Sequence, residues 1–287
     1  MPIQHPFNIL IELSLVTAIT YISMCIFLFF YQTRFLFFPS PHIETTPSSF
    51  YIYYEEVWLP IKVGKSKFEY VHGWWIPTRR PKSKVMLYLH GNALNMGANI
   101  NRANHFHQLG FSVLLIDYRG YGQSQGSFPN ETKIYEDAAA AWNYLIQQKS
   151  VPPNQIVIYG HSLGGGVAID LGSKHHNAAG LIVESSFTSI RDVITHRSDF
   201  SMFPVKLILT QRFASITKVS RLQIPTLFIH GTADVTIPYF MSQKLYNAVT
   251  KPKELLLISG AGHNDVADVA PFQYTKAVNS FSEKVFR

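Results

Sequence analysis

IVIYGHSLGGG, residues 156–166, is the stretch that decides the fold. Its first four residues form an aliphatic run typical of a buried strand, and a G-x-S-x-G pentapeptide follows before a helix-compatible segment. Such a pattern places a serine on a sharp strand-to-helix turn, with its hydroxyl exposed at the end of a sheet. Gly160 and Gly164 are needed there because larger side chains would clash in the strained backbone. The stretch therefore predicts Ser162 as a nucleophile.

Two further residues are expected to activate this serine, because a hydroxyl needs a base and the base needs an orienting group. His263 lies in a glycine-rich loop after the last aliphatic run, and we predict it as the base. Asp234 comes just after the preceding aliphatic run, and we predict it as the acid. The chain order Ser, Asp, His is typical of this arrangement. Glu184, at the end of another run, is the alternative acid, and Asp265 is expected to be a helix N-cap.

Backbone N–H groups are expected to form an oxyanion hole, which stabilises the charge that develops on the carbonyl oxygen. Leu163, directly after the nucleophile, is predicted to supply one donor. The loop HGNA, residues 90–93, resembles the H-G-x loop that supplies the other. We expect Asn92 to be this donor, with Ala93 as the alternative, and His90 to hold the loop by a hydrogen bond.

Short aliphatic runs alternate with helix-compatible stretches from residue 85 onward, a rhythm typical of a parallel sheet covered on both faces. Two earlier segments read as an antiparallel pair of strands joined through Pro60 and Gly64. The sequence thus predicts an α/β protein with a mostly parallel, eight-stranded, doubly wound sheet. The expected strands are 51–59, 67–76, 85–90, 113–117, 156–160, 181–185, 226–230 and 254–259; the expected helices are 101–109, 132–148, 163–173, 237–249 and 265–286.

Two connecting segments are open to more than one interpretation. Residues 188–221 mix apolar and basic side chains between two expected core strands, and we expect a small helical cap insertion bordering the site. An ordinary crossover connection is the alternative. The turn DYRGYG, residues 117–122, either shapes the rim of the pocket or is purely structural.

The N-terminal run Ile9–Tyr31 contains one charged residue, Glu12, and as a helix of about 23 residues it would be roughly 35 Å long. This length is enough to cross a bilayer, and Pro39 and Pro41 are expected to end the helix. We predict a single-pass transmembrane anchor in residues 1–40 and a catalytic domain in residues 41–287. A cleaved signal peptide or a buried helix is the alternative, but no Lys or Arg precedes the run and no A-x-A site follows it.

Basic residues follow the apolar run rather than precede it. Arg34 comes first, and Arg79, Arg80, Lys82 and Lys84 form the densest group. Because positive charge is enriched on the cytoplasmic side of membrane helices, we expect the catalytic domain to face the cytoplasm. The group itself is expected to be solvated or to contact anionic lipid head groups.

The bulk composition argues against several classes of protein. Of 287 residues, 47% are hydrophobic and 15% are charged, which is unlike a disordered chain. The formal net charge of +7 is spread without a block of like charges, so no nucleic-acid-binding arm is expected. Cys25 is the single cysteine, and His105 and His107 are spaced i,i+2, which does not share a helical face. We expect no metal and no cofactor.

Six ordered motifs resemble those of the α/β-hydrolase superfamily: HGNA (90–93), DYRGYG (117–122), GHSLGG (160–165), ESSFTS (184–189), HGTAD (230–234) and GAGHND (260–265). Within it the chain resembles the Bem46-type and ABHD13/ABHD17-type membrane-associated serine hydrolases, from about Phe35 to the C-terminus. The resemblance implies the roles already given to the predicted nucleophile, base, acid and oxyanion donors. It also implies esters, thioesters or lipid acyl groups as substrates, including acyl chains on proteins.

These observations together predict a membrane-anchored serine hydrolase of the carboxylesterase, lipase or acyl-thioesterase type. It would cleave an acyl ester or thioester through an acyl-enzyme formed on Ser162. An amphiphilic substrate is expected because enzyme and substrate would share the bilayer surface. The alternatives are a peptidase or amidase with the same residues, and a non-catalytic binding protein of the same fold.

Overall fold

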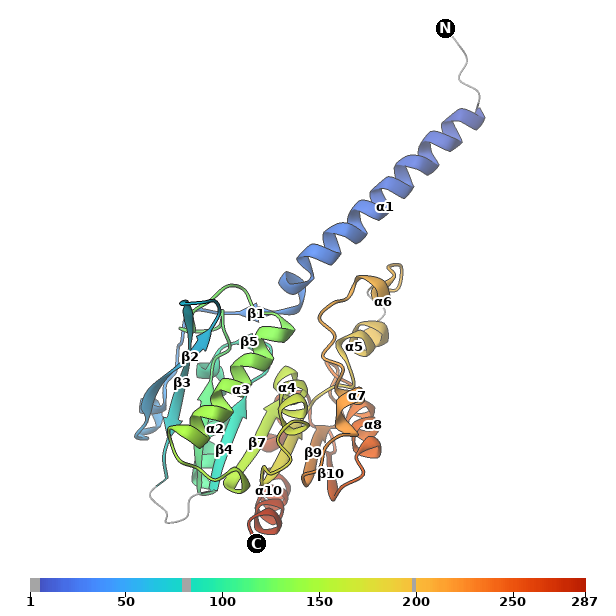
Figure 1. Cartoon of the computed structure of the whole chain (residues 1–287). Coiled ribbons are helices and arrows are strands. Elements are labelled where there is room, and N and C mark those ends of the chain that lie inside the picture. Colours follow the sequence, from blue (N-terminus) through green and yellow to red (C-terminus); the bar gives the residue numbers. More distant parts are fainter. Residues whose placement is uncertain (1–5, 79–83, 198–199) are drawn as a thin grey trace.

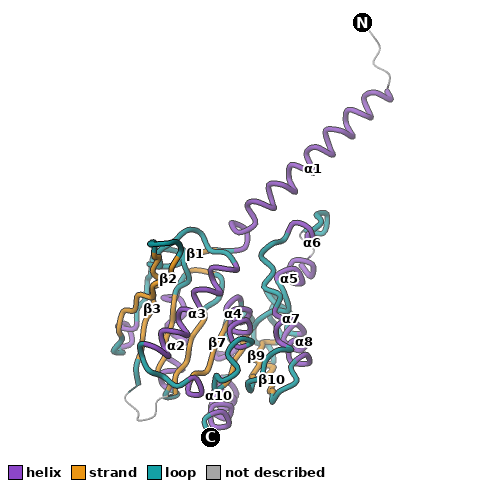
Figure 2. The backbone as a smooth tube through the Cα atoms, viewed as in Figure 1, coloured by secondary structure: helices purple, strands orange, loops and turns teal. Residues whose placement is uncertain are grey.

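An eight-stranded sheet with helices on both faces forms the centre of the computed structural model, which describes residues 6–78, 84–197 and 200–287 (Figures 1 and 2). From edge to edge the strands are β10 (Lys253–Ile258), β9 (Thr226–Gly231), β8 (Gly180–Glu184), β7 (Ile156–His161), β4 (Lys84–Leu89), β6 (Phe111–Ile116), β3 (Phe68–Ile76) and β2 (Glu55–Lys62). Strand β3 is antiparallel to both neighbours, and all other pairs are parallel. The predicted doubly wound α/β sheet is confirmed.

Alternation along the central strands builds one core on each face of the sheet. In β4, Val85 and Leu87 point to the face covered by α3, α4, α7 and α8, whereas Met86 and Tyr88 point to the face covered by α2 and α10. The helices are α1 (Pro6–Leu36), α2 (Ile100–Gln108), α3 (Glu131–Gln147), α4 (Leu163–Gly172), α5 (Ile190–Arg197), α6 (Val205–Ile208), α7 (Ser215–Val219), α8 (Phe240–Ala248), α9 (Val266–Val269) and α10 (Pro271–Val285).

The first predicted strand, 51–59, differs from the strand β2 that the structure contains. It begins at Glu55 rather than at residue 51, and Pro60 lies inside it instead of in the connection. Proline is tolerated there because β2 is an edge strand, where the missing N–H costs no ladder hydrogen bond.

The last predicted helix, 265–286, is wrong as a single element, because Pro271 starts a new helix and separates α9 from α10. Asp265 precedes α9, as expected of an N-cap, but its side chain caps nothing in that helix. Its Oδ1 instead accepts the N–H of Gly262 at 2.6 Å. The carboxylate therefore closes the loop that carries His263.

The predicted small helical insertion consists of the three short helices α5, α6 and α7, which lie between β8 and β9 in the chain (Figure 1). Its segment around α6 contacts α1, so the insertion reaches the N-terminal helix. The described part of the chain contains one helix long and apolar enough to cross a membrane, residues Asn8–Leu36.

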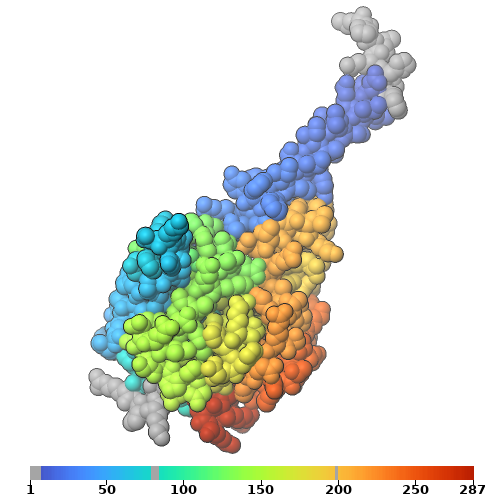
Figure 3. All heavy atoms as spheres, in the orientation of Figure 1, coloured from blue at the N-terminus to red at the C-terminus, as the bar shows by residue number. Residues whose placement is uncertain are grey.

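Helix α1 extends beyond the predicted 9–31 and projects away from the sheet, with its most apolar window unburied (Figures 1 and 3). Directly after it, β1 (Phe38–Pro39) pairs with β5 (Ala93–Leu94). This short pairing ties the end of α1 to the loop in which the second oxyanion donor, Asn92, was predicted. Three members of the predicted basic group, Arg79, Arg80 and Lys82, lie outside the described residues.

Candidate active site

Ser162 lies at the turn between β7 and α4, with φ 55° and ψ −117°. This left-handed φ is strained for a residue with a side chain and turns the hydroxyl out of the sheet. A Cβ on Gly160 would lie 2.1 Å from the carbonyl oxygen of Gly164, and a Cβ on Gly164 would lie 2.0 Å from that of Leu89. Only glycine at both positions lets the turn close.

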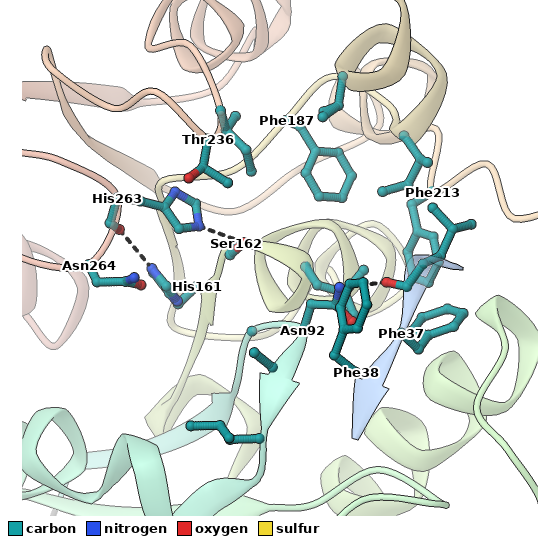
Figure 4. A pocket seen from close by; sticks show the side chains of 18 of the residues that line it. Phe37, Phe38, Asn92, His161, Ser162, Phe187, Phe213, Thr236, His263 and Asn264 are labelled. Atoms are coloured by element: carbon teal, nitrogen blue, oxygen red, sulfur yellow. Dashed lines mark hydrogen bonds between the residues drawn. The ribbon is translucent and has the colours of Figure 1, made fainter. Parts of the chain in front are cut away.

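The structure brings the three predicted residues together at the carboxyl ends of the strands. His263 Nε2 lies 2.9 Å from Ser162 Oγ, and His263 Nδ1 lies 2.7 Å from Asp234 Oδ2 (Figure 4). With Nδ1–H donated to the carboxylate, Nε2 is left as the acceptor that faces the serine hydroxyl. The arrangement can therefore remove the proton of Ser162.

Asp234 accepts two backbone N–H groups on Oδ1, from Thr236 and Ile237, each at 2.8 Å. On Oδ2 it contacts His263 and also Nε2 of His230, at 3.0 Å. Burial by itself raises the pKa of Asp234, but the hydrogen bonds from His230 and His263 outweigh it and hold the pKa below its ordinary value. The carboxylate thus stays ionised.

His230 was not singled out in the sequence, although it opens the HGTAD motif. Its Nε2 faces two acceptors, Asp234 Oδ2 and the carbonyl of Ile237 at 2.8 Å, so this nitrogen carries the proton. Nδ1 lies 2.7 Å from Ser242 Oγ on α8. The buried imidazole therefore holds the acid through the same carboxylate oxygen that contacts His263.

His161, directly before the nucleophile, was also missed. Its Nε2 lies 3.1 Å from the carbonyl oxygen of His263, which makes Nε2–H the donor and ties the base to the nucleophile's strand (Figure 4). Burial and the nearby Arg102 and His263 lower the pKa of His161 well below its ordinary value. The side chain is therefore a neutral positioning group, and its adjacency to Ser162 was the signal that could have found it.

The predicted oxyanion donors lie beside the nucleophile. Leu163 is the first residue of α4, where a backbone N–H has no intrahelical acceptor. A Cβ on Gly91 would lie 3.4 Å from Ser162 Cβ, which places the loop before Asn92 against the serine. The side-chain amide of Asn92 donates one of its two N–H groups to the carbonyl of Leu36 at 2.5 Å, which ties this loop to the end of α1.

The turn 117–122 supports this loop from behind and does not line the cavity. Tyr121 donates its hydroxyl to the carbonyl and side-chain oxygens of Asn92, at 2.7 and 3.0 Å. Tyr118 donates to the carbonyl of His90 at 3.0 Å, and His90 Nδ1 lies 2.7 Å from the carbonyl of Gly91. The turn 117–122 and His90 are therefore structural, as one of the interpretations had it. Tyr121 connects the turn directly to Asn92.

The alternative acid, Glu184, lies away from the base. It is fully buried and accepts the hydroxyls of Tyr159 and Tyr274, at 2.9 and 2.7 Å, while Arg102 lies 3.3 Å from its other oxygen. Strand alternation explains this, because Glu184 is two residues after Ile182, which faces α2 and α10. Its carboxylate belongs to a buried network on that face.

Among the residues that the structure describes, no group of three or more His, Cys, Asp or Glu side chains is arranged so that it could hold a metal ion. His105 Nε2 faces Thr275 Oγ1 at 3.4 Å, and His107 Nε2 faces the carbonyl of Pro77 at 3.2 Å. These two histidines of α2 point to different neighbours.

A cavity of about 1200 Å³ extends from Ser162 in two chemically different directions. Phe37, Phe38, Phe187 and Phe213 lie on one side of Ser162, and His161, His263 and Asn264 lie on the other (Figure 4). The apolar side includes Phe37, Phe38, Phe187, Ile190, Val205, Ile208 and Phe213; the polar side includes Asn101, Arg102, Asn104, His105 and Asn264. The cavity beside Ser162 therefore has a mixed apolar and polar lining.

The chain is similar in sequence to several known proteins. The family described as serine aminopeptidase, S33, matches residues 80–217. An uncharacterized protein of Mycobacterium tuberculosis is 32% identical over 252 residues, 87% of this chain and 86% of its own. Protein bem46 of Schizosaccharomyces pombe is 33% identical over 230 residues, 77% and 75% of the two chains. Human alpha/beta hydrolase domain-containing protein 17B is 34% identical over 194 residues, 65% and 62%.

Solved structures share the fold at lower identity. The Pyrococcus furiosus esterase Pf2001 superposes with a TM-score of 0.72 at 20% identity, over 87% of this chain and 98% of that structure. Pyrococcus horikoshii acylaminoacyl peptidase superposes with a TM-score of 0.62 at 16% identity, over 80% and 41%. The solved structures and the strand order show the fold, and the relatives above show the family. The chain belongs to the α/β-hydrolases of the Bem46 and ABHD type.

Proposed function

We propose that this hydrolase is a membrane-anchored serine hydrolase that cleaves acyl esters or thioesters through an acyl-enzyme on Ser162. The observation that carries the proposal is the unbroken contact from Ser162 Oγ through His263 to Asp234, at 2.9 and 2.7 Å. Both distances lie within the range required for proton transfer along such a chain of groups.

The proposed reaction has two halves. In the first, His263 Nε2 takes the proton of Ser162 while Oγ attacks the carbonyl carbon, and the backbone N–H groups of Asn92 and Leu163 bind the resulting oxyanion. His263 then gives its proton to the leaving alcohol or thiol. In the second half, His263 takes a proton from a water that attacks the acyl-enzyme, and it returns this proton to Ser162 Oγ as the acid leaves. Asp234 stabilises the imidazolium in both.

The two sides of the cavity favour an acyl group with a long apolar chain. Phe37, Phe187 and Phe213 would contact that chain, and each aromatic side chain buries a large apolar area. The polar side, with Asn101 and Asn264, would receive the leaving group. This division favours an amphiphilic ester over a small soluble one.

The anchor proposed for residues 1–40 is supported by the length, apolar composition and exposure of α1. Large apolar side chains exposed all round a helix are unfavourable in water and favourable in lipid. We assign the domain 41–287 to the cytoplasmic side because Arg34 and the later basic residues follow the span.

Labelling with a fluorophosphonate probe tests the proposal on full-length protein in detergent. Wild type and Glu184→Gln are expected to label, because the Glu184 carboxylate contacts tyrosines rather than His263. Ser162→Ala and His263→Ala are expected not to label, and Asp234→Asn is expected to label much more slowly. Folded wild type that fails to label would support a binding protein of the same fold instead.

A panel of matched acyl esters, thioesters and peptide amides then separates the activities. The family description as serine aminopeptidase is the observation that keeps a peptidase in the panel. We expect turnover of long-chain esters or thioesters to exceed that of amides. Faster cleavage of the amides would overturn the ester and thioester assignment.

A further inference from the structure

We propose that residues 200–208, the cap tip, enter the bilayer beside α1, and that substrate acyl chains reach Ser162 laterally from the lipid through the opening between them. This inference rests on the membrane anchor of the proposed function. The cap tip, FSMFPVKLI, contains one charged residue, Lys206.

The contacts between α1 and the cap tip reach the middle of the apolar helix. Tyr21 donates its hydroxyl to the carbonyl of Met202 at 2.8 Å and stacks on Phe203 with ring centroids 5.9 Å apart. A hydrocarbon core is spanned by about 20 helical residues. Wherever such a 20-residue stretch is placed within residues 8–31, the helical rise puts Tyr21 roughly 9 to 15 Å from its C-terminal end. A segment that contacts Tyr21 is therefore at hydrocarbon depth.

The exposed side chains of the cap tip suit lipid rather than water. Met202 is 71% exposed and Leu207 is 79% exposed, and together with the neighbouring apolar face of α1 they form one apolar surface. A narrow cleft between the two elements is lined by Ile22, Cys25, Ile26, Phe29, Phe30, Pro204, Leu207 and Ile208. Lys206 lies two residues before Ile208, which contacts Gln32 just beyond the apolar run, so its ammonium group has a short path to the head groups.

Several backbone polar groups of the cap tip are paired within the protein, which lowers the cost of immersion in hydrocarbon. The N–H groups of Phe203, Leu207 and Ile208 bond to carbonyls of the same segment. The carbonyl of Met202 accepts Tyr21, and that of Ile208 accepts Gln32 Nε2 at 3.2 Å. Helix α1 thus supplies partners for one carbonyl before α6 and for the carbonyl of the last residue of α6.

The cavity that contains Ser162 reaches this same junction. Leu28, Gln32 and Phe35 of α1 line it together with Phe200, Phe203, Val205 and Ile208 of the cap tip. Leu28 lies within about 5 Å of the edge of the hydrocarbon core by the same helical rise. An acyl chain in the leaflet could therefore enter the apolar side of the cavity without crossing water.

Depth measurement in vesicles tests the position of the cap tip. Cys25 is the single cysteine, so Cys25→Ala gives a background for placing an NBD label at one site. Met202→Cys carries the test label, exposed Ser220→Cys in the same insertion is the aqueous control, and Ile22→Cys reports on α1. The full chain is reconstituted into phosphatidylcholine vesicles with brominated acyl chains.

Brominated lipid is expected to quench the labels at positions 202 and 22 but not at position 220. Quenching at 22 with water-exposed behaviour at 202 overturns the inference and leaves the anchor intact. Lack of quenching at both 22 and 202 overturns the anchor of the proposed function and the inference with it.

Activity gives a second readout, with Met202→Asp/Leu207→Asp compared with the apolar control Met202→Leu/Leu207→Met. Neither residue lines the cavity at Ser162. For methylumbelliferyl oleate dissolved in vesicles, the Asp pair is expected to lower kcat/KM about tenfold or more, because charges are excluded from hydrocarbon. Hydrolysis of methylumbelliferyl acetate in water is expected to be unchanged. Equal effects on both esters, or none on the oleate, contradict lateral entry.

Discussion

His230 donates a hydrogen bond from Nε2 to Asp234 at 3.0 Å, on the same carboxylate oxygen that contacts the candidate base. The imidazole is fully buried and reaches Ser242 with its other nitrogen. Because Asp234 can orient His263 only if it is itself held, His230 is a positioning residue for the proposed reaction. Its contribution can be separated from a general effect on folding.

Replacing His230 by Phe removes the donor, and we expect kcat to fall about 10- to 100-fold with little change in KM. His230→Gln retains an N–H donor of similar reach, so it should recover part of this loss. Steady-state hydrolysis of one ester by the three proteins, together with urea unfolding, makes the comparison. Equal losses in the Phe and Gln variants would show that bulk and packing matter rather than the hydrogen bond.

Gly164→Ala is expected to destabilise the fold by about 3 kcal/mol or more, because its Cβ would lie 2.0 Å from the carbonyl oxygen of Leu89. Gly166→Ala is a matched control in the same helix, where the nearest atom, Ser215 Oγ, lies at 3.3 Å. Alanine's better helix propensity should keep that variant within about 1 kcal/mol of wild type. Urea denaturation measures both. Similar free energies of unfolding for the two variants would mean that the backbone at the turn relaxes.

Tyr121→Phe is expected to lower kcat about tenfold while reducing the free energy of unfolding by only about 1 kcal/mol. The lost hydroxyl holds the carbonyl and side chain of Asn92, whose N–H is the proposed oxyanion donor. Tyr135→Phe, which loses a hydroxyl contact with Glu131 away from the site, is the control and should retain full activity. If both variants keep wild-type kcat, Asn92 does not depend on Tyr121 for its position.

The lowered pKa of Asp234 predicts how stability depends on acid. A carboxyl whose pKa is lower in the folded than in the unfolded state contributes stability that is complete above the unfolded pKa, about 3.9, and is lost as pH falls through the folded value. The advantage of wild type over Asp234→Asn should therefore be intact near pH 5 and shrink below about pH 4. Urea titrations at each pH measure it. An advantage that grows as the pH falls from 6 to 4 would mean that burial dominates and raises the pKa.

Much of the fold could be predicted because it depends on local patterns. Aliphatic runs of strand length predicted β4 and β6 to β10 to within about two residues, a common uncertainty of element ends. The glycines around Ser162 predicted the turn because the clash that excludes larger residues is local. The errors at Pro60 and Pro271 arose where position in the sheet, or a break inside an apolar pattern, decided the role of a proline.

The sequence by itself determined the strand and helix periods and the turn at Ser162, since these depend on residues close together in the chain. It also determined the order in which Asp234 and His263 follow Ser162, which is read directly from the chain. Only the tertiary structure decided that His230 and His161 hold those residues, that Glu184 faces buried tyrosines, and that Tyr21 contacts the cap tip. The physical reason is that these contacts join side chains from separate elements. Which of them meet is determined by how the helices and strands pack.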